Sequence, residues 1–324
     1  MPVLVLSVHS RCNCRCIMCD IWKRDTNREL PLASLDAHRE ALRSLKVRWV
    51  VLSGGEPLMH SSFPQLCKFF RELDIRVTLL TAGINLQKRA EEVAHNVDDV
   101  IVSLDGPKAI HDCVRGIKGA FDLLANGVVK LLSLRPELRI SARTTVQRSN
   151  HESLCETIAA AQDLDLSGIS FLAADLTSTA FNRNLPWSEQ RQDELALNPR
   201  EADSLEKEVA SLIASYAREI ESHYISESPA KLRRIVSHFR AHLGLASPEA
   251  PRCNAPWVSA VVGHDGAVQP CFFHPPIGNI HLQSLNDIVN SPSALKFRSS
   301  LIVAENPTCQ RCVCSLHLAS GDVE

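Results

Sequence analysis

The first half of the chain alternates between short apolar runs and longer stretches in which apolar residues recur at helical spacing. Short runs rich in Val, Ile and Leu predict strands, and the amphipathic stretches predict helices. The predicted strands are residues 4–9, 49–53, 75–80, 100–104, 140–146 and 169–172. The predicted helices are residues 34–46, with Ser34 as the N-cap, and then 63–73, 86–95, 121–134 and 151–164.

Repeated strand–helix alternation indicates parallel strands that are joined by right-handed crossovers. The strand runs are almost continuously apolar, as expected when both faces of a sheet are covered. Six strands are too few for a complete eight-stranded barrel. The pattern therefore predicts an α/β fold over residues 1–185, either a partial barrel or an open doubly wound sheet.

The second half has a different rhythm. Residues 186–245 are charged and helix-rich, with helices expected over 188–220 and 229–243, and we interpret them as a helical bridge. A proline-rich linker over 246–256 opens the third region, residues 246–324. Apolar runs at 258–262 and 267–269 flank Asp265-Gly266, a turn signal that predicts a β-hairpin. Short helices are expected at 285–289 and 293–301.

Composition narrows the class of protein. Of 324 residues, 45% are apolar and 22% are charged, which argues against disorder, and the net charge of −2 offers no field for nucleic acid. The apolar runs are far shorter than the ~20 residues of a membrane span, and the N-terminus lacks a signal peptide pattern. We therefore expect a cytoplasmic protein. Disulfides are rare in that compartment, so the 12 cysteines need another explanation.

Three cysteines follow the first predicted strand with C-x3-C-x2-C spacing: Cys12, Cys16 and Cys19. Three thiolates in one short loop can hold three irons of an iron–sulfur cube, which leaves the fourth iron open to a ligand. A zinc knuckle is the alternative, although zinc sites favour four ligands and CxxC pairs.

The second predicted strand ends in Gly54-Gly55-Glu56-Pro57. Glycines at the carboxyl end of a parallel strand allow a ligand to approach the backbone, and the carboxylate of Glu56 suits a cationic amino group. Alone, the glycines would indicate only a turn. Together with the cysteine loop, this segment resembles the radical S-adenosylmethionine (SAM) superfamily, whose fold is a partial (β/α)6 TIM-like barrel.

The resemblance implies that an open iron of a [4Fe–4S] cluster binds SAM, and that reductive cleavage yields a 5′-deoxyadenosyl radical that abstracts hydrogen from a substrate. It places the cluster on Cys12, Cys16 and Cys19. It also assigns Gly54, Gly55, Glu56 and Pro57 to the methionine end of SAM, and Ser103 and Asp105 to its ribose. Arg115 is expected to form a structural salt bridge. Arg143 is expected to face the SAM carboxylate or the substrate, or to be structural.

Two positions depart from the superfamily pattern. Met18 stands before Cys19, where many members have an aromatic residue, and its adaptable side chain could still pack against adenine. Thr81-Ala82-Gly83 stands where many relatives read Thr-Asn-Gly, so the contribution of that asparagine must come from elsewhere.

The four C-terminal cysteines Cys253, Cys271, Cys309 and Cys312 are spaced C-x17-C followed by C-x2-C. A four-cysteine zinc ribbon is one interpretation of this spacing. The segment also resembles the SPASM extension of radical SAM enzymes. A further cysteine of that pattern is missing, because its position is Leu318, so the resemblance implies a truncated, twitch-type extension with one auxiliary [4Fe–4S] cluster.

Five cysteines have no role as ligands in this scheme. Cys14 is interpreted as a bystander within the loop. Cys67, Cys113 and Cys155 are expected to be inert core thiols. Cys314 is an alternative ligand, a bystander, or a donor of hydrogen to a substrate radical.

The resemblance fixes the reaction type better than the substrate. We expect dehydrogenation or epimerisation of a small sugar-like or natural-product-like molecule, with flavodoxin or ferredoxin as the electron donor. Asp175, at the end of the sixth strand, is a candidate base or only a helix cap. The alternative is a peptide maturase, and since no leader-recognition domain precedes the first strand, it would need a separate recognition partner. A non-catalytic iron–sulfur or zinc protein is the third possibility.

Overall fold

The computed structural model describes residues 1–183 and 185–319. Its strands form one sheet in the order β6-β5-β4-β3-β2-β1-β7-β8-β9. The strands are β1 Val3–His9, β2 Trp49–Gly54, β3 Arg76–Thr81, β4 Asp99–Ser103, β5 Arg139–Val146, β6 Gly168–Ala173, β7 Ser259–Val262, β8 Ala267–Gln269 and β9 Gly278–Asn279.

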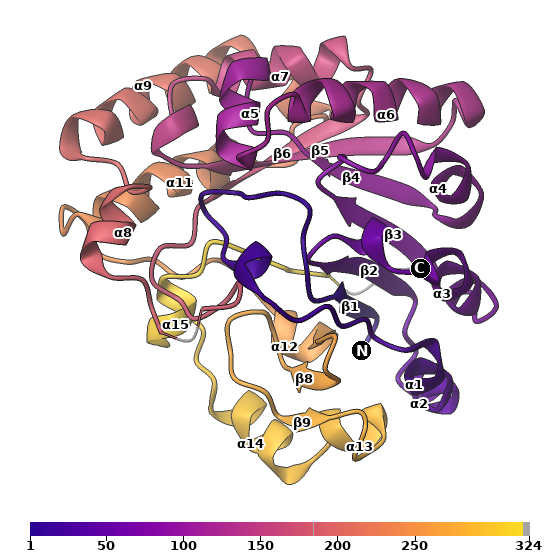
Figure 1. Cartoon of the computed structure of the whole chain (residues 1–324). Coiled ribbons are helices and arrows are strands. Elements are labelled where there is room, and N and C mark those ends of the chain that lie inside the picture. Colours follow the sequence, from indigo (N-terminus) through magenta and orange to yellow (C-terminus); the bar gives the residue numbers. More distant parts are fainter. Residues whose placement is uncertain (184, 320–324) are drawn as a thin grey trace.

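Strands β1 to β6 are parallel and lie side by side in chain order. A doubly wound sheet would reverse its order at a switch point, whereas consecutive neighbours are typical of a barrel. The partial (β/α)6 TIM-like barrel is therefore confirmed. In Figure 1 the helices lie around the outside of this sheet, while the loop after β1 and the C-terminal segments lie on the opposite side.

The helices of the barrel and its bridge form largely where apolar periodicity predicts them. They are α1 Leu32–Asp36, α2 Arg39–Ser44, α3 Phe63–Arg71, α4 Ala90–Asn96, α5 Lys108–Arg115, α6 Ala120–Leu134, α7 Leu154–Asp163, α8 Glu189–Asp193, α9 Pro199–Ser215, α10 Ala217–Glu221 and α11 Pro229–His242. The C-terminal helices are α12 Ala255–Val258, α13 Leu285–Val289, α14 Pro292–Ser300 and α15 Pro307–Gln310. Within the described residues, none is long and apolar enough to cross a bilayer.

Two expectations about helices are wrong. The single helix predicted for 34–46 is divided at His38, and Ser34 lies inside α1 instead of capping it. His38 is buried, with Nε2 2.9 Å from the Ile280 carbonyl and Nδ1 accepting from the Leu285 amide, so tertiary contacts override the local pattern. Helix α5 was not predicted, because its short sequence is largely polar.

The C-terminal hairpin continues the barrel sheet. Strand β7 pairs in parallel with β1, and β8 pairs antiparallel with β7, as the Asp265-Gly266 turn predicts. The C-terminal cysteines are therefore attached to the same strand, β1, that leads into the first cysteine loop. The boundaries at 185 and 245 remain predictions.

The two faces of the parallel strands differ. One face belongs to the hydrophobic core with the helices, and Leu6, Leu52 and Val102 have no exposed surface there. The alternate side chains are half-exposed. Among them are the polar residues Ser7, Ser53, Ser103, Arg143 and Ser170, and the strand register pairs Ser7 with Ser53 and Arg143 with Ser103 and Ser170. The fold thus places several hydroxyl groups and the Arg143 guanidinium on this face.

Candidate functional site

The first cysteine loop crosses the carboxyl ends of the parallel strands. Cys14 and Cys16 are buried, and Cys12 and Cys19 are half-buried. These thiols form one small cluster with Ala82, which follows β3, and with Met18 and Ile84. The structure therefore brings together the three predicted ligands at the end of the barrel where active sites form.

Helix α5 holds the middle of this loop. The Arg15 amide donates to the Arg115 carbonyl at 2.9 Å, and the Ile17 amide donates to the Val114 carbonyl at 3.1 Å. Gly116 ends α5 with φ of 64°, and a Cβ there would lie 2.5 Å from the Arg15 carbonyl oxygen. A glycine is required because the loop backbone passes directly over the end of the helix.

Each predicted ligand sulfur accepts one N–H group. The Cys14 amide donates to Cys12 Sγ, the Arg115 guanidinium to Cys16 Sγ and the Ile21 amide to Cys19 Sγ, each at 3.5 Å. Such donors stabilise sulfur in its anionic form, in which it binds metals. The donor set and its surroundings therefore fit an iron–sulfur cluster, although no three His, Cys, Asp or Glu side chains of the described residues already lie close enough together to hold a metal ion.

The groups around Cys16 also favour its thiolate form. A hydrogen bond from the Cys14 thiol, followed by the charge of Arg115, lowers the pKa of Cys16 to about 7. The same contacts, with Cys12 and Cys16, raise the pKa of Cys14, which stays a neutral thiol. Burial raises the pKa of Cys19 to about 12. Cys16 is thus the thiol most readily deprotonated by the surrounding protein.

The Gly54–Pro57 segment is explained first by contacts within the protein. A Cβ on Gly55 would lie 1.8 Å from the Arg11 carbonyl oxygen, and Gly54 has φ of 113° and lies against Ser7. The Gly55 and Glu56 amides donate to the carbonyls of His9 and Arg11. The glycines therefore let β2 end directly against the cysteine loop. Contact of Gly54, Gly55 and Pro57 with SAM remains a prediction.

The predicted role of the Glu56 side chain needs correction. Its carboxylate has no exposed surface and accepts from the Leu58 amide, the Thr81 hydroxyl at 2.7 Å and the Ala82 amide at 2.9 Å. These donors occupy both oxygens, so the carboxylate does not face a cationic ligand. It fastens the end of β3, and thus Ala82, to the end of β2.

Asp105 also differs from the expectation that it lies near a ribose. It is fully buried, one oxygen accepts from the Thr145 amide, and the other pairs with Arg115 at 2.5 Å. Asp105 thereby fixes the guanidinium that reaches Cys16. The ion pair expected of Arg115 is present.

Ser103 and Arg143, by contrast, remain available on the open face. They are cross-strand neighbours, and Arg143 Nε donates to Ser170 Oγ at 3.3 Å. Among the described residues, Arg143 makes no ion pair within 4 Å. Its charge also acts on the buried Glu227, but without an ion pair within 4 Å the guanidinium keeps N–H groups for a carboxylate ligand.

Asp175 does not have the surroundings of a substrate base. Its side chain is 4% exposed, pairs with Arg183 at 2.7 Å and accepts from the Ser178 hydroxyl and amide. A carboxylate held by a buried guanidinium is stabilised as the anion and is shielded from a substrate. The structure therefore contradicts its assignment as a catalytic base.

The C-terminal cysteines come from three separate segments of the sequence. Cys253 precedes α12, Cys271 follows β8, Cys309 lies in α15 and Cys312 follows it. Burial, and then the nearby thiols of Cys271 and Cys253, raise the pKa of Cys309 to about 11. The Ala255 amide donates to Cys253 Sγ at 3.4 Å, and His274 Nε2 lies 3.6 Å from Cys309 Sγ. These converging thiols fit a second iron–sulfur centre.

The remaining cysteines differ in their surroundings. Cys67 is buried and Cys155 is half-buried, but Cys113 is exposed on α5, so its interpretation as a core thiol is wrong. Cys314 is exposed, and its carbonyl accepts from the Cys312 thiol at 2.8 Å. The charges that act on the Cys314 thiol include Arg143 of the open face. The Cys314 thiol is therefore within electrostatic range of both Cys253 and Arg143.

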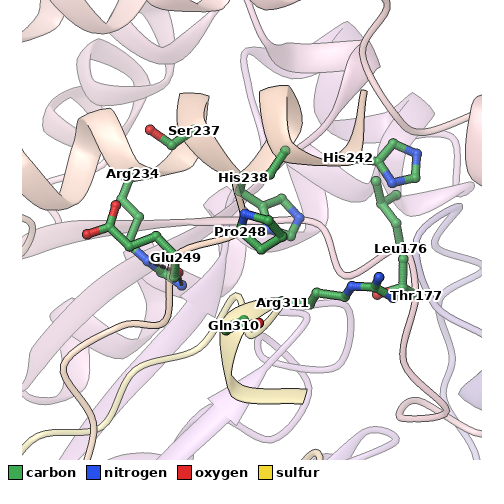
Figure 2. Close-up of a pocket in the computed structure, with 11 residues that line it drawn as sticks. Leu176, Thr177, Arg234, Ser237, His238, His242, Pro248, Glu249, Gln310 and Arg311 are labelled. Carbon is green, nitrogen blue, oxygen red and sulfur yellow. Dashed lines mark hydrogen bonds between the residues drawn. The ribbon is translucent and has the colours of Figure 1, made fainter. Parts of the chain in front are cut away.

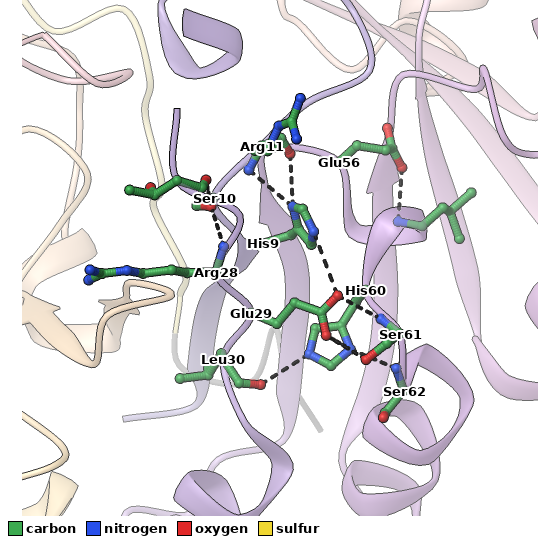
Figure 3. Close-up of polar contacts among 12 residues, drawn as sticks. His9, Ser10, Arg11, Arg28, Glu29, Leu30, Glu56, His60, Ser61 and Ser62 are labelled. Carbon is green, nitrogen blue, oxygen red and sulfur yellow. Dashed lines mark hydrogen bonds and ion pairs between the residues drawn. The ribbon is translucent and has the colours of Figure 1, made fainter. Parts of the chain in front are cut away.

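Sequence reasoning missed a polar network at the base of the first loop (Figure 3). Glu29 lies between His9, 3.7 Å away, and His60, 3.9 Å away, and it accepts from the Ser61 amide and hydroxyl. This network fixes the chain after the cysteine loop, where it returns to the ends of β1 and β2. Nothing in the spacing of residues 20–30 marks it, because its partners lie at the ends of β1 and β2.

A cavity of about 170 Å³ lies between α11 and the segment that carries Cys309 and Cys312 (Figure 2). Arg234, His238 and Arg311 line it, and Arg234 also donates to the Cys312 carbonyl at 2.6 Å. The cavity contains none of the residues predicted to touch SAM. It borders the segment between Cys309 and Cys312 on the side of α11.

Comparison with known proteins identifies the family. The model of the radical SAM superfamily matches residues 6–166, and the SPASM iron–sulfur cluster-binding domain matches residues 253–313. The chain belongs to the radical SAM superfamily and carries a SPASM domain. It is therefore an enzyme that uses SAM with a [4Fe–4S] cluster, together with auxiliary iron–sulfur chemistry.

Individual relatives differ in how much of the chain they resemble. The chain is 26% identical over 333 residues to Fe-coproporphyrin III synthase of Methanosarcina barkeri, covering 96% of this chain and 80% of the relative. It is 32% identical over 156 residues to mycofactocin maturase MftC of Mycolicibacterium smegmatis, covering 46% of this chain and 39% of the relative.

Solved structures share the fold over nearly the whole chain. Streptococcus suis SuiB bound to SAM matches with a TM-score of 0.65 and 16% identity, covering 98% of this chain and 73% of SuiB. SuiB bound to its precursor peptide SuiA matches with the same TM-score, 14% identity, and coverage of 98% of this chain and 72% of SuiB. At this identity the similarity shows the fold alone.

Proposed function

We propose that this enzyme abstracts hydrogen from a small-molecule substrate, with its first cluster on Cys12, Cys16 and Cys19. The observation that carries the proposal is the arrangement of one N–H donor on each of these three sulfurs at the open end of the barrel. Three ligands leave one iron of a cube free for SAM. When bound, the cluster supplies the electron that cleaves SAM to a 5′-deoxyadenosyl radical.

The residues of the chain then have distinct tasks. Arg143 on the open face supplies the positive charge for a carboxylate, and we assign that carboxylate to SAM because Ser103, the predicted ribose contact, is its cross-strand neighbour. Asp105 holds Arg115, which donates to Cys16, and Glu56 holds Ala82 against the cysteine loop. The protein thus positions the reacting groups, while the cofactor supplies the radical.

Cys253, Cys271, Cys309 and Cys312 are proposed to hold one auxiliary [4Fe–4S] cluster, as in a twitch-type domain. Four thiols suffice for one cube, and the thiols of Cys253 and Cys271 lie within electrostatic range of both Cys309 and Cys312. Their attachment to β1 through β7 keeps this centre on the open side of the barrel. A flavodoxin or ferredoxin is the proposed source of electrons.

The test of the cofactor chemistry compares reconstituted wild-type enzyme with Cys16→Ala and Cys67→Ser, all reduced by dithionite. We expect wild-type enzyme and Cys67→Ser to release 5′-deoxyadenosine from SAM and Cys16→Ala to release none. Cys67 is a matched control because it is a buried thiol in α3, remote from the cysteine loop. Cleavage retained in Cys16→Ala would contradict the proposal.

Similarity to a porphyrin enzyme over almost the full chain supports a small natural-product-like substrate. Tetrapyrrole intermediates are therefore the first compounds to test, and sugar-like intermediates are the second. The measurement is the rate of 5′-deoxyadenosine formation with each compound, followed by the mass of the product. Loss of two mass units indicates dehydrogenation. An unchanged mass in H2O, with a gain of one unit at carbon in D2O, indicates epimerisation.

Cys314 distinguishes these two outcomes. Its thiol is within electrostatic range of Cys253 and of Arg143 on the open face, which supports a role in returning hydrogen to a substrate radical. Cys314→Ala should stall an epimerase while it still cleaves SAM, and it should leave a dehydrogenase active. The activity of this one variant therefore distinguishes epimerisation from dehydrogenation.

A peptide maturase is the second candidate, supported by the similarity of the core to MftC and by the fold that the chain shares with SuiB. Such an enzyme would bind a precursor peptide with the help of a recognition partner. The discriminating experiment adds short precursor peptides encoded near the gene, with and without neighbouring small proteins. A peptide-dependent rise in 5′-deoxyadenosine and a mass change in the peptide would replace the small-molecule proposal.

A further inference from the structure

The connection between β6 and α8 lies against the first cysteine loop. We define it by residues 174–183 and 185–188, the part that the structure describes. Its central side chain is Arg183, which is 1% exposed and pairs with Asp175 at 2.7 Å. The guanidinium also lies 3.5 Å from the ring centre of Trp187, so it is held on both sides.

This connection contacts the backbone on both sides of Cys19. Arg183 donates to the Met18 carbonyl at 3.3 Å, and Asn182 Nδ2 donates to the Asp20 carbonyl at 2.9 Å. Trp187 Nε1 donates to the Asp20 carboxylate at 2.6 Å. The residues immediately before and after this proposed ligand are therefore fixed by one segment located more than 150 positions away.

The same connection reaches the second cysteine region. The ring of Phe181 lies 5.3 Å from that of Phe272 and 6.3 Å from that of Phe273, and these two residues directly follow Cys271. Phe181 and Asn182 have φ of 59° and 70°. A left-handed backbone at a bulky residue such as Phe181 is unfavourable and persists only where surrounding contacts hold it. The connection is therefore held in place at both ends.

We propose that Arg183 is a positioning residue for the Cys19 side of the first cluster, and that Phe181 links this loop to the auxiliary centre. The inference rests on the proposed function, because it takes Cys19 and Cys271 as cluster ligands. It also gives Asp175 a role: its carboxylate orients Arg183 toward the Met18 carbonyl. Asp175, at the end of β6, thus supports the cysteine loop through Arg183 and does not act as a catalytic base.

The chemistry of arginine explains why this position is sensitive. A planar guanidinium can bond to Asp175 and to the Met18 carbonyl while it stacks on Trp187. A lysine keeps the charge but cannot make these contacts in one plane. Groups that orient a metal ligand without binding the metal typically contribute about 10–100-fold to affinity or activity.

The test uses reconstituted holoenzyme of wild type, Arg183→Lys and Phe181→Leu, with Arg76→Lys as a matched control. Arg76 pairs with Asp99 at 2.7 Å in the barrel but has no contact with either cysteine region. Iron content and the thermal midpoint report assembly. Low-temperature EPR of the reduced enzyme with SAM, the rate of SAM cleavage and the ratio of 5′-deoxyadenosine to product report positioning.

For Arg183→Lys we expect full iron content, an altered EPR signal of the SAM-bound cluster and SAM cleavage reduced by about tenfold. Phe181→Leu should keep SAM cleavage but raise the ratio of 5′-deoxyadenosine to product about threefold, within the range of modest coupling between sites. Arg76→Lys should match wild type. Wild-type EPR and cleavage in Arg183→Lys would overturn the role of Arg183, and an unchanged ratio in Phe181→Leu would overturn the link.

If Arg183→Lys loses iron, the variant Trp187→Phe tests whether the connection positions the Cys19 side of the first cluster. This change keeps an aromatic ring beneath the guanidinium and removes only the hydrogen bond to Asp20. An altered EPR signal with full iron supports the inference, and a wild-type signal overturns it. SAM cleavage retained in Cys16→Ala would instead contradict the proposed function, so the two failures can be told apart.

Discussion

The two cysteine regions are built in opposite ways. The first is one short loop, Cys12–Cys19, whose thiols are close in sequence and whose backbone is held by α5 and by the β6–α8 connection. The second draws its thiols from three segments between Cys253 and Cys312. Local sequence thus supplies the first group of thiols, and folding supplies the second.

This difference indicates which contacts each cysteine region depends on. The first depends on buried charged groups around a compact loop, above all the Asp105–Arg115 pair beside Cys16. The second depends on β7 and α15 arriving in the correct places on the open side of the barrel. Changes around the first site should therefore alter SAM cleavage, whereas changes in the second should alter only the later conversion of the substrate.

The largest expected effect is that of Cys16→Ala, which removes the ligand sulfur that Arg115 contacts. We expect SAM cleavage to fall by more than about 100-fold, beyond the range seen for groups that only orient ligands. The measurement is 5′-deoxyadenosine formation after dithionite reduction. Activity within tenfold of wild type would break the comparison, since the first region would then not be the centre of SAM chemistry.

Cys271→Ala should separate the two regions. SAM cleavage is expected to stay within about threefold of wild type, because the contact of Phe181 with Phe272 and Phe273 couples the two regions only modestly. Turnover of substrate should be lost. Parallel assays of 5′-deoxyadenosine and product measure both effects, and equal loss of the two activities would mean that the auxiliary cysteines also support the first cluster.

A pH effect on stability is expected from His111, which supports the first region by accepting from the Asp105 amide at 3.2 Å. Burial, and then the charge of Arg115, lowers its pKa to about 4. Because this pKa is below the unfolded value of 6.5, the stability it confers is complete above pH 6.5 and is lost as pH falls toward 4. The loss amounts to about 3 kcal/mol.

The measurement for His111 is the thermal midpoint of the holoenzyme between pH 4 and pH 7. His111→Asn should have a flatter profile than wild type in this window. His95→Asn is the matched control, because His95 is exposed on α4. A profile for His111→Asn that runs parallel to wild type would show that other groups cause the acid sensitivity.

The smallest expected effect compares the extra cysteine in each region. Cys14 is 1% exposed between the thiols of Cys12 and Cys16, so Cys14→Ala should destabilise the protein by about 1 kcal/mol. Cys314 is exposed, and Cys314→Ala should leave the thermal midpoint unchanged. Both variants should keep their iron. Iron loss in Cys14→Ala would turn this residue from a packing group into a ligand.

Much of the barrel could be predicted because its strands are continuous apolar runs and its helices are amphipathic. The exceptions have tertiary causes. The helix expected over 34–46 is divided because His38 bonds to Ile280 and Leu285 from the C-terminal region. Helix α5 is short and about half of its residues are polar, and the cysteine loop packs against its end.

The assignment of acidic residues shows the limit of motifs more sharply. Glu56, Asp105 and Asp175 stand at strand ends where ligands commonly bind, and the sequence could not show that each carboxylate is buried and already paired. Whether an acid faces a ligand or a guanidinium depends on which distant donor reaches it.

By itself, the sequence determined the chemistry of this protein: a C-x3-C-x2-C loop, a Gly-Gly-Glu-Pro segment and four later cysteines identify a radical SAM enzyme with a SPASM domain. The spacing of ligands within a short loop is a local property, so it can be recognised directly in the sequence. Only the tertiary structure decided which side chains support that chemistry. Arg115, Arg183 and Trp187 reach the cysteine loop across about 100 to 170 positions, and contacts at such separation arise only when the barrel closes around the loop.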